Sequence, residues 1–510
     1  MKLGAFHLLG AVVVGLGFVQ VGSAEYTDAS ESDTARFRRA LDRRLSPHAN
    51  ISTPESENFE NAAMRWSPFG APNITTVVQV ANTHDVANTV KLANQYGIPF
   101  LATNHRHGVS TVMQNLQGGV QIDVSGLQTI QLSKTRQDAV TLGGGVYTTE
   151  VIAYLFQHGR MSASGSCGCV GLVGAALGGG IGKTQGQFGL MLDNILDATV
   201  VLANGDIVVA SEKSHSDLFW GLRGAGHNFG VVTELTYRTH ELFPADGHWY
   251  IATLGFTNDK LEDVLEVYQR FTGPGSDVGL TLTLQLAFNP ELSEVEPTLR
   301  LLINYAGSEQ QAARYADPFL HLADVKVINA SVPYYLVASA SGSDVDNLPC
   351  QNSLLRHPGI PIQLNGTDIP TLRAISNTFR DAVAAHPGLQ GGFALESYGW
   401  QAVQSVPAES TAYPWRGDYI YAFWAGSYED ASLDEPAIEL GEEIRRLLLN
   451  GSGQSEVHAY VNYALGTETF GELYGHEEWR QERLSALKQK YDPKGVFSYY
   501  HPIPLSYSQT

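Results

Sequence analysis

Apolar and polar positions between residues 68 and 241 switch repeatedly between two spacings. Short apolar runs bounded by Gly, Asn or Asp predict strands, and an apolar face that recurs at helical spacing predicts helices. The predicted strands are Thr76–Ala81, Ile98–Thr103, Val120–Asp123, Thr129–Leu132 and Ala139–Leu142, and the predicted helices are His84–Tyr96 and Thr148–Gln157. This mixture indicates an α+β domain whose glycines gather at its turns.

From residue 242 to residue 455 the pattern changes to longer strand-like runs that alternate with amphipathic segments. The predicted strands are Trp249–Phe256, Val278–Phe288, Thr298–Tyr305 and Asp418–Trp424, and the predicted helices are Lys260–Phe271, Gln310–Leu322, Pro370–Ala385 and Pro436–Leu449. Such alternation indicates an antiparallel sheet backed by helices. A chain of 510 residues is too long for one typical core, so we expect two such domains after a polar N-terminal segment at residues 25–67.

The most unusual stretch is Gly165–Gly182, which holds eight glycines in eighteen residues and no charged side chain. Glycine permits positive φ and close backbone approach, and successive N–H groups in such a bend form a concavity suited to phosphate oxygens. The stretch therefore predicts a phosphate-binding loop, and a glycine-rich connection without a ligand is the alternative. A hairpin about Asn204-Gly205 and a second glycine cluster at residues 217–233 follow it.

These glycine clusters resemble those of a known family. The chain reads G-x-C-x-x-V-G-x-x-G, then L-G-G-G-x-G, then D-L-F-W-G-x-R-G-x-G-x-N-F-G-V-V-T. This order resembles berberine bridge enzyme-like oxidoreductases, within the vanillyl-alcohol oxidase/p-cresol methylhydroxylase superfamily. The resemblance implies a two-part FAD-binding domain of the p-cresol methylhydroxylase type at residues 68–241 and a substrate-binding domain at residues 242–455. The cofactor contacts that it implies here are Val170, Gly171, Gly174, Gly178, Gly179, Asn228, Gly230 and Val232.

A second matching loop lies within residues 100–111. His107 falls at the histidine that family members often bond to the 8α carbon of the flavin, and the resemblance implies Asn104 and Gly108 beside it as further cofactor contacts. Family members commonly have glycine where this chain has His105 and Arg106, whose side chains could instead offset pyrophosphate charge. The resemblance thus implies FAD attached through His107, and an ordinary loop histidine is the alternative.

The chain has three cysteines, Cys167, Cys169 and Cys350. Cys167 matches a cysteine that can bond to C6 of the flavin in the family, so the resemblance allows a second covalent link. A small buried thiol, or a disulfide between Cys167 and Cys169, are the alternatives. The spacing is not that of a disulfide framework, and no Cys/His cluster has zinc-site spacing, so we expect no metal.

The end of the chain, residues 456–510, carries a third signature. Tyr460-Val-Asn-Tyr463 matches the Y-x-N-Y that returns to the flavin in the family, and K-x-x-Y-D-P-x-x-x-F matches from Lys488 onward. The resemblance places Asn462 and Tyr463 beside the cofactor. On a regular strand, Tyr460 and Asn462 would share one face and Tyr463 would lie on the other.

Two tyrosines are the candidate catalytic residues. We expect Tyr460 near the flavin as proton relay or substrate hydrogen-bond partner, with Tyr398, from the family-like segment Glu396-Ser-Tyr-Gly399, as the second candidate. A phenol titrates near pH 10, so a base role requires cationic neighbours. Tyrosines that only pack under the ring are the alternative. Ala422 aligns with the glutamate base of the plant alkaloid enzyme, which disfavours ring closure by that mechanism.

Charge and targeting signals restrict the partners. The chain has 32 Lys and Arg against 52 Asp and Glu, a net charge of −20, so neither nucleic acid nor a stable membrane association is expected. Residues 1–24 combine one Lys, an apolar core and terminal small residues, as in a cleaved signal peptide, with a retained anchor as the alternative. Five Asn-x-Ser/Thr sites fit secretion as a glycoprotein: Asn50, Asn73, Asn329, Asn365 and Asn450.

The resemblance, together with the predicted signal peptide, therefore implies a secreted FAD-dependent oxidase. It would transfer a hydride from an alcohol, carbohydrate or secondary-metabolite carbon to the flavin, which molecular oxygen reoxidises with release of hydrogen peroxide. Val170 lies at the position near the flavin edge where this chain, with valine, resembles the oxygen-reactive members of the family. A dehydrogenase of the same fold with another electron acceptor and a non-catalytic extracellular flavin-binding protein are the alternatives. The substrate is expected to be a small molecule.

Overall fold

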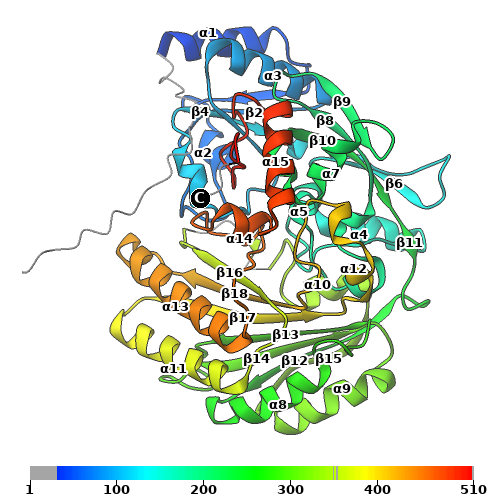
Figure 1. The fold of residues 1–510 in the computed structure, drawn as a ribbon, viewed down its shortest axis with the longest axis vertical. Coiled ribbons are helices and arrows are strands. Elements are labelled where there is room, and N and C mark those ends of the chain that lie inside the picture. Colours follow the sequence, from blue (N-terminus) through cyan, green and yellow to red (C-terminus); the bar gives the residue numbers. More distant parts are fainter. Residues whose placement is uncertain (1–30, 348–349, 352–353, 508–510) are drawn as a thin grey trace, which may run out of the picture.

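The computed structural model describes residues 31–347, 350–351 and 354–507 (Figure 1). The signal peptide predicted at residues 1–24 lies outside these ranges. Within them, no helix has both the length and the apolar character needed to cross a membrane.

The first sheet has four strands in the order β1 (Asn50–Ser52), β2 (Ile74–Gln79), β4 (Gly119–Asp123) and β3 (Phe100–Thr103). Strands β2, β4 and β3 run parallel, and β1 pairs antiparallel with β2. Helices α1 (Glu31–Asp42) and α3 (Thr83–Tyr96) pack against this part, which has its own apolar core. The loop that carries His107 leaves the carboxyl end of β3, where ligands commonly bind in parallel sheets.

The second sheet is antiparallel, with the order β5 (Ile130–Leu132), β6 (Ala139–Gly143), β10 (Val231–Arg238), β8 (Ile195–Val201) and β9 (Ile207–Ser211). The predicted hairpin is confirmed: β8 and β9 pair across the Asn204-Gly205 turn, where Gly205 takes the left-handed φ of 78° that this type of turn favours. Helices α5 (Leu172–Gly178) and α7 (Ser216–Ala225) contact each other beside it.

The third sheet is antiparallel, with the order β15 (Val325–Pro333), β12 (His248–Phe256), β14 (Thr298–Tyr305), β13 (Leu280–Ala287), β17 (Gln390–Tyr398), β18 (Ile420–Ser427) and β16 (Gly359–Leu364). Its outer side is covered by helices α8 (Leu261–Phe271), α9 (Glu309–Leu322), α11 (Ile369–Ala385) and α13 (Asp434–Ser452) (Figure 1). Leu and Ile side chains of strands and helices form one core between the layers. The predicted antiparallel sheet backed by helices is therefore confirmed.

Three strands of this sheet were not predicted, for identifiable reasons. Strand β16 contains Pro361, which ordinarily argues against a strand and is tolerated at this sheet edge. Strand β17 contains Gly391-Gly392, a turn signal, directly after its first residue, and β15 is an edge strand with largely exposed side chains. The remaining elements are α2 (Phe59–Ala63), α4 (Thr148–Gln157), β7 (Arg160–Met161), α6 (Gln185–Phe188), β11 (His240–Glu241), α10 (Val337–Ala340), α12 (Gln401–Ser405), α14 (Phe470–Tyr474) and α15 (Glu478–Tyr491).

A buried lysine joins the C-terminal segment to the second glycine cluster. Helix α15 packs on α7, and the Lys488 ammonium donates to Asp492 at 2.7 Å, to the Phe497 carbonyl at 2.9 Å and to the Asn228 carbonyl at 3.1 Å. Asn228 receives the Ile503 N–H at 2.9 Å and donates to the Tyr474 hydroxyl at 3.0 Å. The third signature therefore closes the fold over the first half of the chain.

Replacing Lys488 by Met is expected to reduce the free energy of unfolding by about 3–5 kcal/mol, because Asp492 would remain buried without its cation. Lys490→Met is the control: its exposed pair with Asp217 is worth at most about 1 kcal/mol. Urea denaturation of both variants measures the difference. Equal stabilities would show that the buried pair does not hold the segment.

Candidate active site

A cavity of about 790 Å³ lies between the third sheet and the two smaller sheets. Its volume is within the roughly 300–1,000 Å³ of ordinary ligand sites. The predicted site residues that line it are Asn104, His105, Arg106, His107, Gly108, Cys167, Val170, Gly171, Gly174, Gly230, Val232, Tyr398, Tyr460, Asn462 and Tyr463. Residues from five separate stretches of sequence thus meet at one cavity.

Three of the predicted cofactor contacts lie outside the cavity lining. Asn228 is buried in the Lys488 network described above. A Cβ atom at Gly178 would collide with the Asn462 side chain, and one at Gly179, whose φ is 143°, would lie 2.9 Å from the Tyr460 ring. These two glycines therefore allow the C-terminal segment to approach the glycine loop.

The first loop provides less free positive charge than its sequence indicates. Arg106, at a φ of 61°, pairs with the buried Asp123 carboxylate at 3.2 Å. The His105 ring stacks on Tyr147 and contacts the Gly145 carbonyl at 3.0 Å. Burial lowers the pKa of His105 to about 3, so the ring is neutral near pH 7. Asp123 thus offsets part of the Arg106 charge and His105 is uncharged, whereas Arg106 Nε has no partner among the described residues. That one of these side chains offsets pyrophosphate charge stays a prediction.

Arg65 is a buried cation of the cavity wall that the sequence analysis missed. It is 7% exposed and donates from Nη2 to the Gly108 carbonyl at 2.9 Å. Its Nε and Nη1 atoms have no hydrogen-bond partner within the described part of the chain, and neither have Asn104 Oδ1 and Thr103 Oγ1 on the same wall. Buried polar atoms are rarely left unpaired in proteins. These atoms of Arg65, Asn104 and Thr103 therefore fit an anionic ligand that forms hydrogen bonds. No motif covers Arg65, and no sequence signal indicated it.

Open space beside the glycine loop fits the same ligand. A Cβ atom at Gly174 would meet no atom within 4 Å, although this residue lines the cavity. His107, on the opposite loop, stacks against Trp66 with ring centroids 5.4 Å apart. Burial, together with the charges of Arg65 and Arg106, lowers the pKa of His107 to about 4. Its imidazole is therefore neutral at pH 7 and has a lone pair available.

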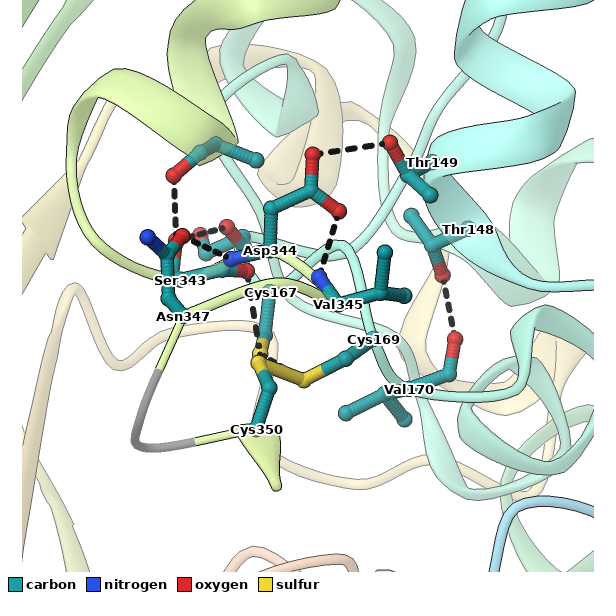
Figure 2. Close-up of a disulfide and its surroundings, with 12 residues drawn as sticks. Thr148, Thr149, Cys167, Cys169, Val170, Ser343, Asp344, Val345, Asn347 and Cys350 are labelled. Carbon is teal, nitrogen blue, oxygen red and sulfur yellow. Dashed lines mark hydrogen bonds between the residues drawn. A yellow bond between two sulfur atoms is a disulfide. The ribbon is translucent and has the colours of Figure 1, made fainter.

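The three cysteines form one sulfur cluster, which corrects the expectation of no disulfide framework. Cys169 and Cys350 are joined by a disulfide, and the Cys167 thiol lies 3.2 Å and 3.7 Å from their sulfur atoms (Figure 2). The alternative link between Cys167 and Cys169 is also not found. The segment after α10 crosses the glycine loop, where the Gly168 N–H donates to the Ser343 carbonyl at 2.7 Å. This crossing brings Cys350 to Cys169 across 181 residues of sequence.

The Tyr460 hydroxyl is held by three donors. Its oxygen accepts from the N–H groups of Gly180 at 2.9 Å and Ile181 at 3.4 Å and from the Asn462 amide at 2.8 Å. Burial nevertheless raises the pKa of Tyr460 to about 12. The expected strand alternation is wrong: the Tyr463 N–H donates to the Tyr460 carbonyl at 2.9 Å in a turn, so both rings lie together, 5.0 Å apart.

Glu396 is the only carboxylate among the described residues of the cavity lining. Its Oε2 atom accepts from the Tyr398 hydroxyl at 3.2 Å and the Tyr463 hydroxyl at 3.3 Å. Burial raises the pKa of Glu396, and the two phenols and the charge of Lys183 oppose this increase. Alternation along β17 puts Glu396 and Tyr398 on one face, a signal that could have identified the carboxylate.

Lys183 is a second cation that the sequence analysis missed. Its ammonium donates to the Ser166 carbonyl at 2.9 Å, and the Ser166 hydroxyl contacts the Tyr398 hydroxyl at 2.9 Å. Burial lowers the pKa of Lys183 to about 8. The cavity therefore contains a lysine and a carboxylate that both titrate closer to neutrality than their exposed counterparts.

Comparison with known proteins assigns the family. A model of the FAD binding domain matches residues 74–211, and one described as berberine and berberine like matches residues 459–504. The chain is 37% identical over 465 residues to the FAD-linked oxidoreductase anuG of Penicillium roqueforti, covering 90% of each chain. The chain belongs to the berberine bridge enzyme-like family. It is also 34% identical over 473 residues to the FAD-linked oxidoreductase chyH of Penicillium rubens, covering 91% of this chain and 93% of that one.

Solved structures share the fold of this berberine bridge enzyme-like protein at low identity. BBE-like 1 of Physcomitrella patens matches with a TM-score of 0.78 and 21% identity, over 92% of this chain and 100% of that one. Glucooligosaccharide oxidase of Acremonium strictum, described with a 6-S-cysteinyl, 8α-N1-histidyl FAD, matches with a TM-score of 0.78 and 20% identity over the same shares. The expected α+β fold is confirmed, and the protein is an FAD-linked oxidoreductase.

We predict that peptide mapping without reduction links Cys169 to Cys350 and leaves Cys167 outside the disulfide. Because the bond closes a long loop, Cys350→Ser should reduce the free energy of unfolding by about 2–4 kcal/mol, whereas Cys167→Ser should retain the cross-link. Fragmentation between Cys167 and Cys169 is needed, since both lie on one tryptic peptide. A cross-link between these two residues would contradict the structure.

Proposed function

We propose that the enzyme is a secreted oxidase that acts on an alcohol, carbohydrate or secondary-metabolite carbon. The observation that carries this proposal is the shared cavity, in which Glu396, between two phenols, faces the same space as the loops of His107 and Cys167. FAD held in this cavity would supply the hydride acceptor for oxidation of the substrate carbon, and molecular oxygen would be the final electron acceptor, with hydrogen peroxide as the product. Oxidase names among the structural relatives support this direction.

The chain offers specific groups to hold FAD. Arg65, with two unpaired nitrogens, is the cation that would pair with an anionic part of the cofactor. Asn104 Oδ1 would accept a hydrogen bond from a donor group of the cofactor. The open space at Gly174 lets the ligand approach the backbone. His107 is neutral at pH 7 and is the better of the two attachment candidates, because burial raises the pKa of the Cys167 thiol and keeps it protonated.

Glu396 is the group that we propose to accept the substrate proton. Its pKa is raised toward neutrality, whereas that of Tyr460 is about 12, so the carboxylate is a better base near pH 7. Tyr398 and Tyr463 donate to Glu396 and orient it. Tyr460, which we expect beside the substrate, keeps the role of hydrogen-bond partner rather than base.

We also propose secretion and glycosylation. All five Asn-x-Ser/Thr asparagines lie within the described residues and are exposed: Asn50, Asn73, Asn329, Asn365 and Asn450. Exposed asparagines can accept glycans without disturbing the core. The net charge of −20 remains the reason to expect neither nucleic acid nor anionic membrane as a partner.

A screen of phenolic alcohols, oligosaccharides and polyketides, followed by flavin bleaching and peroxide release in air, tests the oxidase. With a substrate in hand, Glu396→Gln should slow flavin reduction about 100-fold or more, and Glu234→Gln, an exposed glutamate outside the cavity lining, should not. Since the base must be deprotonated, the wild-type rate should rise with pH through the raised pKa of Glu396 and then level off. Bleaching without peroxide would indicate a dehydrogenase, and a flavin that no substrate bleaches would indicate a non-catalytic protein.

Attachment of FAD can be tested independently of turnover. We expect acid precipitation to leave flavin on the protein, and the tryptic peptide that contains His107 to carry its mass. His107→Ala should release the flavin into acid, whereas His105→Ala, whose neutral ring contacts the Gly145 carbonyl, should not. A flavin mass on the peptide that contains Cys167 would show a second covalent bond, between Cys167 and the flavin. Complete release of flavin from the wild-type protein by acid would contradict both attachments.

A further inference from the structure

The face of the third sheet toward the cavity has a definite arrangement of side chains. Strand pairing places Arg300, Gln285, Ala394 and Phe423 in one row across β14, β13, β17 and β18. The next row, two residues along each strand, includes Thr283 opposite Glu396. All of these residues line the cavity.

Exposure identifies the outer end of this face. Arg300 is exposed, Gln285 is half-buried, and Thr281 and Asn304, further along the same strands, are only 1% and 2% exposed. The row of Arg300 is therefore nearer to solvent, and the row of Glu396 lies deeper. The two backbones are two strands and two residues apart, roughly 12 Å in a regular sheet.

Arg300 is not neutralised by the protein. Although the side chain reaches solvent, partial desolvation by the cavity wall lowers the pKa of Arg300, and no charge of the described residues contributes to this shift. Among the described residues, its one polar contact is with Gln285 Oε1, at a long 3.4 Å. Of its row, Gln285, Ala394 and Phe423 are uncharged. In a chain of net charge −20, this wall of the cavity presents an unpaired guanidinium, a group suited to bidentate recognition of a carboxylate.

We propose that the substrate is an organic carboxylate whose acid group is bound by Arg300 and whose oxidised carbon lies next to Glu396. This inference rests on the proposed function of the same cavity and adds the substrate class and its orientation. An acid group placed deep in the cavity would be repelled by Glu396, whereas at the outer row it is attracted by Arg300. The carboxylate is therefore not attached directly to the oxidised carbon.

The rest of the wall suits the body of such a substrate. Phe423 offers an aromatic face, and Ala394 and Gly392 leave space beside it. Thr281 Oγ1 is buried without a hydrogen-bond partner in the described part of the chain, so a hydroxyl or carbonyl of the substrate can bond to it. A small, partly aromatic acid that carries further oxygen atoms meets all of these groups.

The test compares acids with their uncharged amides. Calorimetry on the full-length holoprotein would measure binding of 4-hydroxycinnamate, 2-naphthoate and hexanoate against the matching primary amides. We expect at least one acid to bind about tenfold more tightly than its amide, and the preference to weaken at high salt. Arg300→Gln should reduce the preference to less than about twofold, and Arg300→Lys should retain part of it, because lysine keeps the charge and loses the planar fork.

Arg270→Gln is the matched control, since Arg270 is an exposed arginine of α8 outside the cavity lining, and it should leave the preference unchanged. Wild-type protein that binds no acid more tightly than its amide, or an unchanged preference in Arg300→Gln, would overturn the inference. Calorimetry detects binding without turnover. Peroxide release without acid preference therefore contradicts this inference alone, and acid preference without peroxide release contradicts the proposed oxidase alone.

Discussion

The phenolic oxygen of Tyr460 accepts hydrogen bonds from two backbone N–H groups of the glycine loop and from Asn462, and the cavity depends on this contact. The C-terminal turn can approach so closely only because Gly178 and Gly179 have no side chains. The loop and the turn then form two walls of the cavity, and the third sheet forms another. Larger residues at these glycines would push the turn outward and admit water to groups that are now buried.

The sequence predicted those elements whose own residues carry a clear turn or helix pattern. The hairpin about Asn204-Gly205 and the helices that back the third sheet have strong patterns and were confirmed. Strands β16 and β17 carry a proline and a Gly-Gly pair, so their local signals indicate turns, and pairing with β18 overrides them. The turn at Tyr460–Tyr463 was missed because this segment pairs with no strand within the described residues, and the glycine loop supplies hydrogen bonds instead.

The residues of the candidate site likewise divide into those that stand in sequence motifs and those that reach the site only through folding. His107, Cys167 and Tyr460 stand in motifs, so their meeting at one cavity could be expected from the sequence. Arg65 and Cys350 belong to no motif and reach the site only through folding over long sequence separations. The Cys169–Cys350 disulfide could not be predicted, since pairing depends on how the segment after α10 crosses the glycine loop.

Removal from water is the largest influence on the acid–base character of this cavity. Burial raises the pKa of Glu396, lowers that of Lys183 to about 8 and lowers that of His107 to about 4. Each shift favours the uncharged form, since a charge loses hydration inside the protein. The His107 imidazole and the Glu396 carboxylate do not need to touch for their pKa values to change together, because both shifts depend on how well the cavity excludes water. A substitution that opens the cavity would move all three pKa values back together, whereas one that removes a single charge would alter only its near neighbours.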